Sequence, residues 1–295
     1  MSHGLIVNAP AKLNLYLGIH PEKNERGYHR VDTIMTALEL SDTVEIMPAP
    51  SWSFTCSEPF GCAEESNTLF SAAQMLSSET GNEPNFSVNV VKRIPSQAGL
   101  GGGSSDGAAM LAGLCSFWDI DPHSQLVLSI AQELGADVSF FLYEGPALMQ
   151  GVGATYVRSF PEQHLNCVLV KRTESAVSTQ RAYEVFDEML PEPGDLTSIV
   201  QALEDQDIPG VLSSVSNNLG VVAEKIEPGV EDALAWLAAR EGVQGVSVCG
   251  SGSCVVGFCD RPLDAKQIAD DAKEAGFWGY ATKTTPQGVT IQPTP

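Results

Sequence analysis

The sequence has few basic residues and no long apolar run. Its 295 residues include 16 Lys and Arg against 37 Asp and Glu, which gives a formal net charge of −21 at pH 7. Such an acidic chain repels nucleic acid and anionic membrane surfaces, so we expect neither as a partner. No apolar stretch of about 18 residues is present to cross a membrane. The N-terminus also lacks the basic and apolar segments of a secretion signal, so we expect a cytoplasmic protein.

The cysteines lack the spacing of a metal site. The seven cysteines form no Cys-x-x-Cys pair, and Cys249, Cys254 and Cys259 have no histidine near them in the sequence. Structural zinc sites need tighter ligand spacing. The pattern predicts reduced and mostly buried thiols, consistent with the cytoplasm.

The chain length favours two closely packed lobes, because 295 residues lie where one hydrophobic core begins to divide into two. Alternating apolar residues and turn signals predict strands at 5–7, 13–19, 42–47, 86–90, 140–142, 167–170 and 288–291, with strand-turn-strand patterns at 147–156 and 246–256. Helical spacing and capping residues predict helices at 66–76, after Ser105, and at 124–134, 231–240 and 265–275. The acidic segment 191–209 is expected to be exposed.

The most specific stretch is a glycine-rich run between a predicted strand and a predicted helix. Gly99, Gly101, Gly102 and Gly103 fall within five positions. Glycines allow positive φ angles and let the backbone lie against a ligand, while a helix start offers unpaired amides and the positive end of its dipole. The run therefore predicts an anion site, most often one for phosphate.

Two common phosphate loops do not fit this run. Gly103-Ser104-Ser105 lacks the lysine that the loop of the common nucleotide triphosphatases requires. The five residues from Gly99 to Gly103 do not keep the Gly-x-Gly-x-x-Gly spacing of dinucleotide folds. A flexible linker is the remaining alternative, although linkers are not flanked by a strand and a helix.

The run resembles the Pro-x-x-x-Gly-Leu-Gly-x-Gly-Ser-Ser signature of the GHMP small-molecule kinases, in which it wraps the ATP phosphates. Further segments that resemble elements of this family are Pro10-Ala11-Lys12-Leu13-Asn14-Leu15, Gly27-Tyr28-His29 with Thr33, Leu134-Gly135-Ala136-Asp137-Val138, Val177-Ser178-Thr179 with Tyr183, and Gly250-Ser251-Gly252. The resemblance runs essentially end to end. It is strongest over 9–35 and 92–142.

Without the resemblance, the patterns alone favour commoner roles for the same residues. Lys12 and Asn14 would lie on the solvated face of a strand. Asp137 would be an ordinary loop carboxylate. Ser66 or Asn67 would cap a helix, and Tyr183 would pack in a helical core.

The resemblance implies an α+β, two-lobed GHMP kinase fold. It implies a ribosomal-protein-S5-like N-terminal lobe over residues 1–158 and a ferredoxin-like C-terminal lobe over residues 159–295, with the last strand free to return to the N-terminal lobe. The implied cofactors are ATP and Mg²⁺, and the implied acceptor is the 2-hydroxyl of cytidine-diphospho-methylerythritol in non-mevalonate isoprenoid precursor biosynthesis. A kinase for homoserine or a mevalonate derivative, or a non-catalytic sensor, remains an alternative. We expect a monomer or a weak homodimer.

The resemblance also implies the roles of individual residues. Asp137 would deprotonate the acceptor hydroxyl, and Lys12 would stabilise that carboxylate and the charge on the transferred group. The implied ATP-binding residues are Asn67, Lys92, Pro95, Ala98, Gly99, Leu100, Gly101, Gly102, Gly103, Ser104 and Ser105, with Ser105 also a candidate Mg²⁺ ligand. The implied substrate-binding residues are Asn14, Tyr28, His29, Thr179 and Tyr183, the two tyrosines flanking cytosine. The third glycine motif consists of Gly250, Ser251 and Gly252.

The sequence departs from the family pattern at a few positions. Ser139 stands where the family has Pro, a change that we expect to affect backbone rigidity more than chemistry. Asn218 stands where the family has Asp, and we expect it to have a structural role. Ser253 and Cys254 replace Pro and Thr after the third glycine motif.

Overall fold

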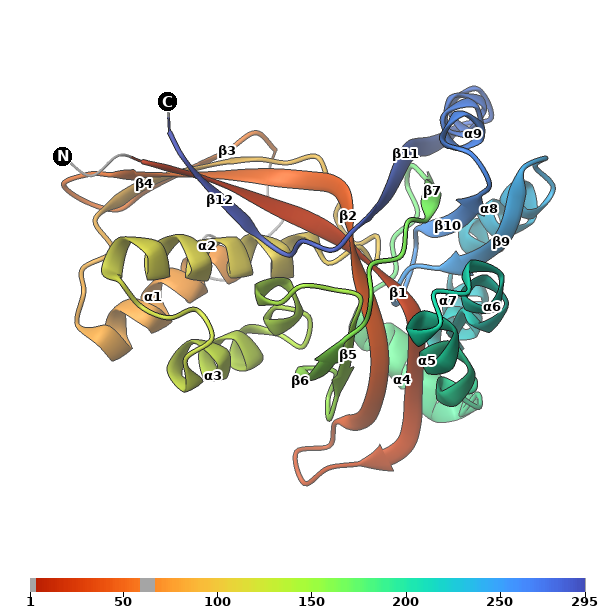
Figure 1. Cartoon of the computed structure of the whole chain (residues 1–295), viewed down its shortest axis with the longest axis horizontal. Helices are drawn as coiled ribbons and strands as arrows, with labels where there is room; N and C mark the ends of the chain where they lie inside the picture. The colour runs from red at the N-terminus through yellow and green to blue at the C-terminus, as the bar shows by residue number, and fades with distance from the viewer. Residues whose placement is uncertain (1–3, 59–66, 295) are drawn as a thin grey trace.

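The computed structural model describes residues 4–58 and 67–294 (Figure 1). Its elements are, in chain order, β1 (Leu5–Lys23), β2 (His29–Pro48), β3 (Ser53–Cys56), α1 (Thr68–Thr80), β4 (Phe86–Val91), α2 (Gly102–Trp118), α3 (Gln125–Leu134), the 3₁₀ helix η2 (Ser139–Leu142), β5 (Ala147–Gln150), β6 (Thr155–Ser159), β7 (Asn166–Arg172), α4 (Thr179–Met189), α5 (Leu196–Glu204), α6 (Ile208–Ser214), β8 (Ser216–Asn217), α7 (Asn218–Ile226), α8 (Pro228–Ala238), β9 (Val243–Val248), β10 (Val255–Cys259), α9 (Pro262–Glu274), β11 (Phe277–Thr285) and β12 (Thr290–Pro293). Helices α1 to α3 lie on one side of the molecule in Figure 1, and α4 to α9 lie on the other with β7 and β9 to β11.

A long antiparallel hairpin of β1 and β2 joins these two groups. The main strand order is β12-β1-β2-β11-β7-β10-β9, with β4 and β5 also paired to β2. The predicted strand at the C-terminus is β12, which pairs with β1. Register shifts between β1 and β2 fall between Pro10 and Lys12 and again between Asn14 and Tyr16. Such irregularities redirect side chains, and these two enclose the segment that carries Lys12 and Asn14.

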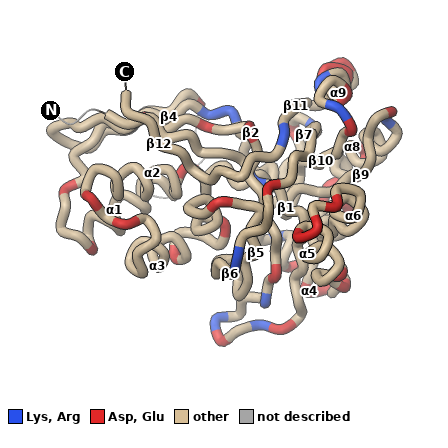
Figure 2. The backbone as a smooth tube through the Cα atoms, in the orientation of Figure 1, with Lys and Arg blue, Asp and Glu red and all other residues tan. Residues whose placement is uncertain are grey.

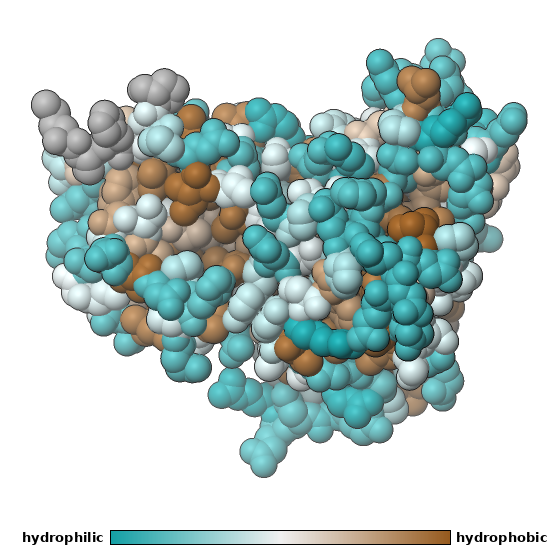
Figure 3. Space-filling view, viewed as in Figure 1, coloured by the Kyte–Doolittle hydropathy of each residue, from teal (hydrophilic) through white to brown (hydrophobic). Residues whose placement is uncertain are grey.

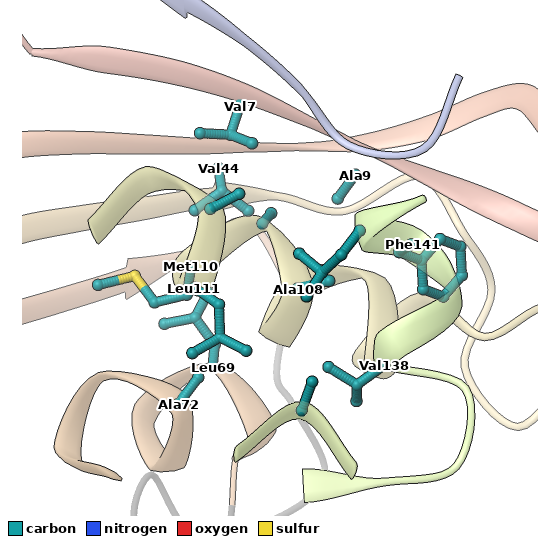
Figure 4. Close-up of a cluster of buried hydrophobic side chains, with 14 of the residues drawn as sticks. Val7, Ala9, Val44, Leu69, Ala72, Ala108, Met110, Leu111, Val138 and Phe141 are labelled. Atoms are coloured by element: carbon teal, nitrogen blue, oxygen red, sulfur yellow. The ribbon is translucent and has the colours of Figure 1, made fainter. Parts of the chain in front are cut away.

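The largest core cluster fixes α2 against the sheet. Val7 and Val44 of β1 and β2 face Met110 and Leu111 of α2, and Leu69 of α1 lies beyond them (Figure 4). Each fully buried side chain of this size contributes about 1.5–3 kcal/mol to folding. The apolar residues of α2 and the glycine at position 113, where a Cβ would lie 2.4 Å from Ile46 Cδ1, allow close packing. The first turn of α2 is therefore held rigidly by the core.

Acidic residues cover much of the surface. Figure 2 shows Asp and Glu spread over the helices and loops, and basic residues mixed with acidic ones at the tip of the β1–β2 hairpin. On the face shown in Figure 3, hydrophilic side chains predominate. No helix of the described chain has the length and apolar character that a membrane span requires.

Most predicted elements are confirmed, but some predictions from local pattern are wrong. Helix α2 begins at Gly102 rather than after Ser105. Residues 140–142 form a 3₁₀ helix and not a strand, because Phe141 N donates to Val138 O and Tyr143 N to Phe140 O. Segment 191–209 is not simply exposed, since it contains α5, whose Ile199 and Leu203 are buried.

Cysteines and helix caps follow the prediction where the structure describes them. Helix α1 begins at Thr68 with Asn67 as its cap, and the alternative cap Ser66 lies outside the described residues. The described cysteines are free, and all except Cys56 are buried. Helices α4 to α7 and strands β8 and β11 were not predicted as elements.

Candidate active site

One cleft of about 1810 Å³ gathers the residues that the sequence singled out. It lies between the glycine run, the β1–β2 hairpin, the start of α4 and the turn between β9 and β10. Every candidate site residue named from the sequence lines it except Ser105. Segments distant in the chain therefore meet in a single site.

Lys12 and Asp137 form the charged centre of the cleft. Lys12 Nζ lies 3.3 Å from Asp137 Oδ2 and donates a 2.7 Å hydrogen bond to Asn14 Oδ1. The Lys12 side chain is almost fully buried, whereas the Asp137 side chain is 32% exposed and faces the cleft. A bound molecule can therefore reach the carboxylate, while the ammonium group supports it from behind.

Asp137 stands in a tight turn between α3 and η2. Val138 N donates to Gly135 O across this turn at 3.1 Å. Ser139 Oγ, at the position where the family has Pro, donates a 2.7 Å hydrogen bond to Ala154 O in the β5–β6 connection. The buried serine therefore ties the aspartate turn to a second wall of the cleft.

The glycine run packs directly on the turn between β9 and β10. Gly99 and Gly101 have φ angles of +74° and +72°, which favour glycine. A Cβ atom at position 99 would lie 1.8 Å from Cys249 O, and one at position 101 would lie 2.9 Å from Lys12 Cγ. Cys254 N also donates to Ala98 O at 3.2 Å. The absence of side chains at these glycines lets three backbone segments close around Lys12.

The start of α2 provides an anion-binding surface. Its cap residue, Gly101, offers no side-chain hydrogen bond to the first turn. A Cβ atom at Gly103 would meet nothing within 4 Å, so the cleft is open there. The first amides of a helix lack internal partners and carry the positive end of the helix dipole. This arrangement suits phosphate oxygens.

Lys92 is held beneath the glycine run by two fully buried carboxylates. Its Nζ contacts Asp42 and lies 2.6 Å from Asp106 Oδ2. Asp42 Oδ1 accepts hydrogen bonds from the backbone of Arg93 (2.5 Å) and Ile94 (2.9 Å). Burial raises the pKa of Asp106 to about 6 although Lys92 opposes that rise. The ammonium group thus links the start of the run to the first turns of α2.

Aromatic side chains line the end of the cleft near α4. The rings of His29 and Tyr183 stack with centroids 5.8 Å apart, and Thr179 Oγ1 lies 3.1 Å from Ser251 Oγ. Burial, and secondarily the Asp137 carboxylate, raise the pKa of Tyr183 to about 12. Tyr28 lies in the cleft lining on the hairpin tip and is 62% exposed. This end of the cleft therefore has an aromatic lining.

His29 is fixed by contacts on both ring nitrogens. Its Nδ1 lies 2.7 Å from the carbonyl oxygen of His20 and must donate to it, because a carbonyl only accepts. Its Nε2 lies 3.1 Å from Asp187 Oδ1, without the geometry of a directed hydrogen bond. The same Asp187 carboxylate accepts from Lys23 Nζ at 2.6 Å. The hairpin is thereby joined to α4.

Comparison with known proteins agrees with this geometry. The model of the GHMP kinases N terminal domain matches residues 67–145, and that of the GHMP kinases C terminal domain matches residues 199–277. A 4-diphosphocytidyl-2-C-methyl-D-erythritol kinase of Chlorobaculum parvum is 34% identical over 97% of this chain and 98% of its own. One of Bacillus pumilus is 32% identical over 90% of this chain and 91% of its own. The chain belongs to the GHMP kinase family.

Solved structures agree with this assignment. The crystal structure of a 4-(cytidine 5'-diphospho)-2C-methyl-D-erythritol kinase has a TM-score of 0.75 and 29% identity, covering 95% of this chain and 98% of its own. A homoserine kinase from Cytophaga hutchinsonii has the same TM-score at 18% identity, and so shows the fold alone. The predicted two-lobed α+β GHMP kinase fold is confirmed. Members of this family use ATP as the phosphate donor.

Two neighbouring asparagines of this GHMP kinase have different roles, and the first supports the third glycine motif. Asn217 Nδ2 donates to Val248 O and Gly250 O, both at 2.8 Å. Asn218, which replaces the family's Asp, instead bonds the backbone of Ile19 through both ends of its amide. Asn217 was not singled out from the sequence. Asn218 has the structural contacts expected of it.

The sequence analysis also did not single out three carboxylates of this GHMP kinase. Asp42 and Asp106 were missed because their partner Lys92 is distant from Asp42 in the chain. Asp187 was missed as well, although its position four residues after Tyr183 places both on one helix face. From this four-residue spacing, Asp187 could have been predicted to lie near Tyr183 in the site.

Proposed function

We propose that this GHMP kinase transfers the γ-phosphoryl group of ATP to the 2-hydroxyl of 4-diphosphocytidyl-2-C-methyl-D-erythritol. One observation carries the proposal. A helix start with open space in front of it, the Lys12–Asp137 pair and an aromatic-lined end share one cleft. The names of relatives that span nearly the whole chain support the same reaction.

The proposed mechanism depends on positioning more than on covalent chemistry, because phosphoryl transfer has a loose transition state. The triphosphate lies against the amides at the start of α2. Asp137 orients the acceptor hydroxyl and accepts its proton late in the transfer, since a carboxylate cannot ionise an alcohol beforehand. Lys12 stabilises the charge on the transferred group. Thr179, His29 and Asn14 orient the acceptor.

The cytidine end of the acceptor is assigned to the aromatic rings. We propose that Tyr28 and Tyr183 flank the cytosine, which is supported by their positions in the cleft lining. Base stacking on an aromatic ring contributes about 1–3 kcal/mol. The acceptor would then extend across the cleft, with its reacting hydroxyl at Asp137 and its base at the tip of the hairpin.

Mg²⁺ is the divalent cation that we propose for this site. The described residues include no group of three or more His, Cys, Asp or Glu that could hold a metal. This fits Mg²⁺, which keeps several waters and binds chiefly through substrate phosphates. Ser105 remains our candidate protein ligand, because its buried Oγ has no partner among the described residues. The metal would neutralise charge on the phosphates.

Two other functions remain for comparison. A GHMP kinase for homoserine or a mevalonate derivative would share the glycine run, Lys12 and Asp137. It would have no need for Tyr28, His29 and Tyr183 at the other end of the cleft. A non-catalytic sensor would be expected to have lost Lys12 or Asp137, and both are in place.

We also propose a lobe boundary at residues 158 and 159. It is supported by the end of β6 at Ser159 and by the pairing of β7 with β10 and β11 rather than with the N-terminal strands. The return of β12 to β1 supports assigning the last strand to the N-terminal lobe.

ADP release from ATP tests the proposed reaction. The assay compares the cytidine-diphospho acceptor with homoserine and mevalonate at equal concentrations. We expect the first alone to stimulate ADP release, with one phosphate appearing on its 2-hydroxyl. Stimulation by homoserine or mevalonate instead would refute the assignment of the acceptor.

A further inference from the structure

A buried chain of hydrogen bonds leads from β2 to the ammonium group of Lys12. Thr33 Oγ1 donates to Tyr16 O at 2.7 Å and accepts from Asn14 Nδ2 at 2.9 Å. Asn14 Oδ1 in turn accepts from Lys12 Nζ at 2.7 Å. Thr33, Asn14 and Lys12 are 2%, 2% and 4% exposed. These hydrogen bonds are therefore shielded from water, which could otherwise replace a partner lost by mutation.

Only one direction of donation satisfies every atom of this chain. The Tyr16 carbonyl can only accept, so the single proton of the Thr33 hydroxyl points to it. Thr33 then offers only lone pairs, and Asn14 must present its NH₂ group to them. The Asn14 oxygen is thereby directed at Lys12, whose ammonium group can only donate. The threonine hydroxyl thus decides which way the asparagine amide faces.

The register of the hairpin explains why Thr33 can act in this way. The shift between Asn14 and Tyr16 occurs where β1 lies opposite Ile34 and Met35. The Tyr16 carbonyl there accepts the Thr33 side chain. Bulged strands commonly redirect groups next to active sites.

The position of Lys12 leaves little tolerance for a misdirected amide. A Cβ atom at Gly250 would lie 3.1 Å from Lys12 Nζ, so the ammonium group is closely enclosed on that side. On another side, Nζ lies 3.3 Å from Asp137 Oδ2. A flipped Asn14 would direct its NH₂ group at the ammonium ion and push it from this position.

From this geometry we infer that Thr33 is a positioning residue for phosphoryl transfer. It locks the Asn14 amide, which holds Lys12 against Asp137. The inference rests on the proposed function, since it assigns Lys12 and Asp137 to the reacting centre. Thr33 itself takes no proton from the substrate and transfers none.

Kinetics of Thr33 variants test the inference. Thr33→Val keeps the shape of the side chain and removes the hydroxyl, while Thr33→Ser keeps the hydroxyl. The matched control is Thr36→Val on the same strand, because Thr36 is equally buried but does not line the cleft. We expect kcat of Thr33→Val to fall about 10- to 100-fold, the scale of a small misplacement of a catalytic group. Thr33→Ser and Thr36→Val should stay within about threefold of wild type on the same scale.

The division between kcat and KM separates positioning from a general structural defect. The KM for ATP should change little in Thr33→Val, because the glycine run is untouched. A kcat of Thr33→Val equal to that of Thr36→Val would overturn the inference. So would a Thr33→Ser variant as slow as Thr33→Val.

A measurement without substrate keeps the inference separate from the proposed function. Exchange of the Asn14 side-chain amide protons with water is followed by NMR, with the signal assigned by its loss in Asn14→Asp. We expect slow exchange in wild type and Thr33→Ser, and exchange at least about tenfold faster in Thr33→Val, where the acceptor is lost.

The wild-type protein alone decides the case if Thr33→Val does not fold. An Asn14 amide that exchanges as fast as that of the exposed Asn24 would overturn the inference, and slow exchange would support it. If wild type fails to phosphorylate the cytidine-diphospho acceptor but shows slow Asn14 exchange, the proposed function fails and the hydrogen-bond chain stands.

Discussion

Gly99 and Cys249 are in direct backbone contact, such that a Cβ atom at position 99 would lie 1.8 Å from the carbonyl oxygen of Cys249. The first residue belongs to the glycine run before α2, and the second precedes the third glycine motif. The two motifs therefore form one continuous backbone surface. Any side chain at position 99 would separate them and disturb the wall that encloses Lys12.

This contact predicts a large effect of Gly99→Ala. The new methyl group would collide with fixed backbone, and the φ angle of +74° would add strain. We expect a loss of at least about 2 kcal/mol in the free energy of unfolding. Denaturant unfolding measures it, and a variant as stable as wild type would contradict the close approach.

Gly103→Ala is the matched control within the same run and makes its own prediction. A Cβ atom there meets nothing within 4 Å, and Gly103 lies in the first turn of α2. We expect unchanged stability but a KM for ATP raised about tenfold, because the methyl group would occupy space at the helix start that we propose to bind phosphate. An unchanged KM would place the phosphates elsewhere.

The buried Asp42–Lys92–Asp106 cluster predicts a pH dependence of stability. Burial raises the pKa of Asp106 from 3.8 to about 6, so the folded chain holds this proton more tightly than the unfolded chain. The stabilising contribution of Asp106 is complete below about pH 4 and is lost as the pH rises through about 6.

Asp106→Asn removes this dependence and keeps an acceptor for Lys92. Between about pH 5 and pH 7.5, the melting temperature of wild type should fall relative to that of the variant. Asp205→Asn, at an exposed position, serves as the control. A difference between wild type and Asp106→Asn that stays constant over this range would contradict the account.

Ser139→Ala tests the support of the Asp137 turn. The variant loses the buried hydrogen bond to Ala154 O, which contributes about 1 kcal/mol to stability. We expect kcat to fall about three- to tenfold, because small displacements of a catalytic group slow the reaction. Ser213→Ala, which loses an exposed bond to Gly210 O, should leave kcat unchanged. Equal kcat values for the two variants would show that the serine does not position Asp137.

Tyr183→Ala tests the assignment of the cytosine. Loss of a stacking ring should raise the KM for the cytidine-diphospho acceptor about 10- to 100-fold. The KM for ATP should stay near its wild-type value, and Tyr183→Phe should bind the acceptor almost normally. An unchanged acceptor KM in Tyr183→Ala would place the base elsewhere.

The sequence predicted those parts of the site that lie in short continuous segments. The glycine run, the Lys12 segment and the Asp137 turn each have a local signature, because glycine conformations and a helix start are encoded by neighbouring residues. The Lys12–Asp137 contact itself is a tertiary relationship. It could be expected only from the resemblance to a family.

Interactions between distant polar residues escaped the sequence analysis. Asp42 precedes Lys92 by a whole helix and two strands, so no local pattern links them. Thr33 is one of many buried residues of β2, and only the register of the hairpin places it on Asn14. Tertiary packing likewise overrode strand propensity at 140–142, where the aromatic run folds into a 3₁₀ turn.

The account depends most on the carboxylate of Asp137, and single-turnover kinetics of Asp137→Asn test it most directly. The amide keeps the size of the side chain but cannot accept the proton of the acceptor hydroxyl. We predict unchanged ATP affinity and a rate of phosphoryl transfer about 10²- to 10⁴-fold below that of wild type. A transfer rate within a few-fold of wild type, with ATP bound normally, would contradict it.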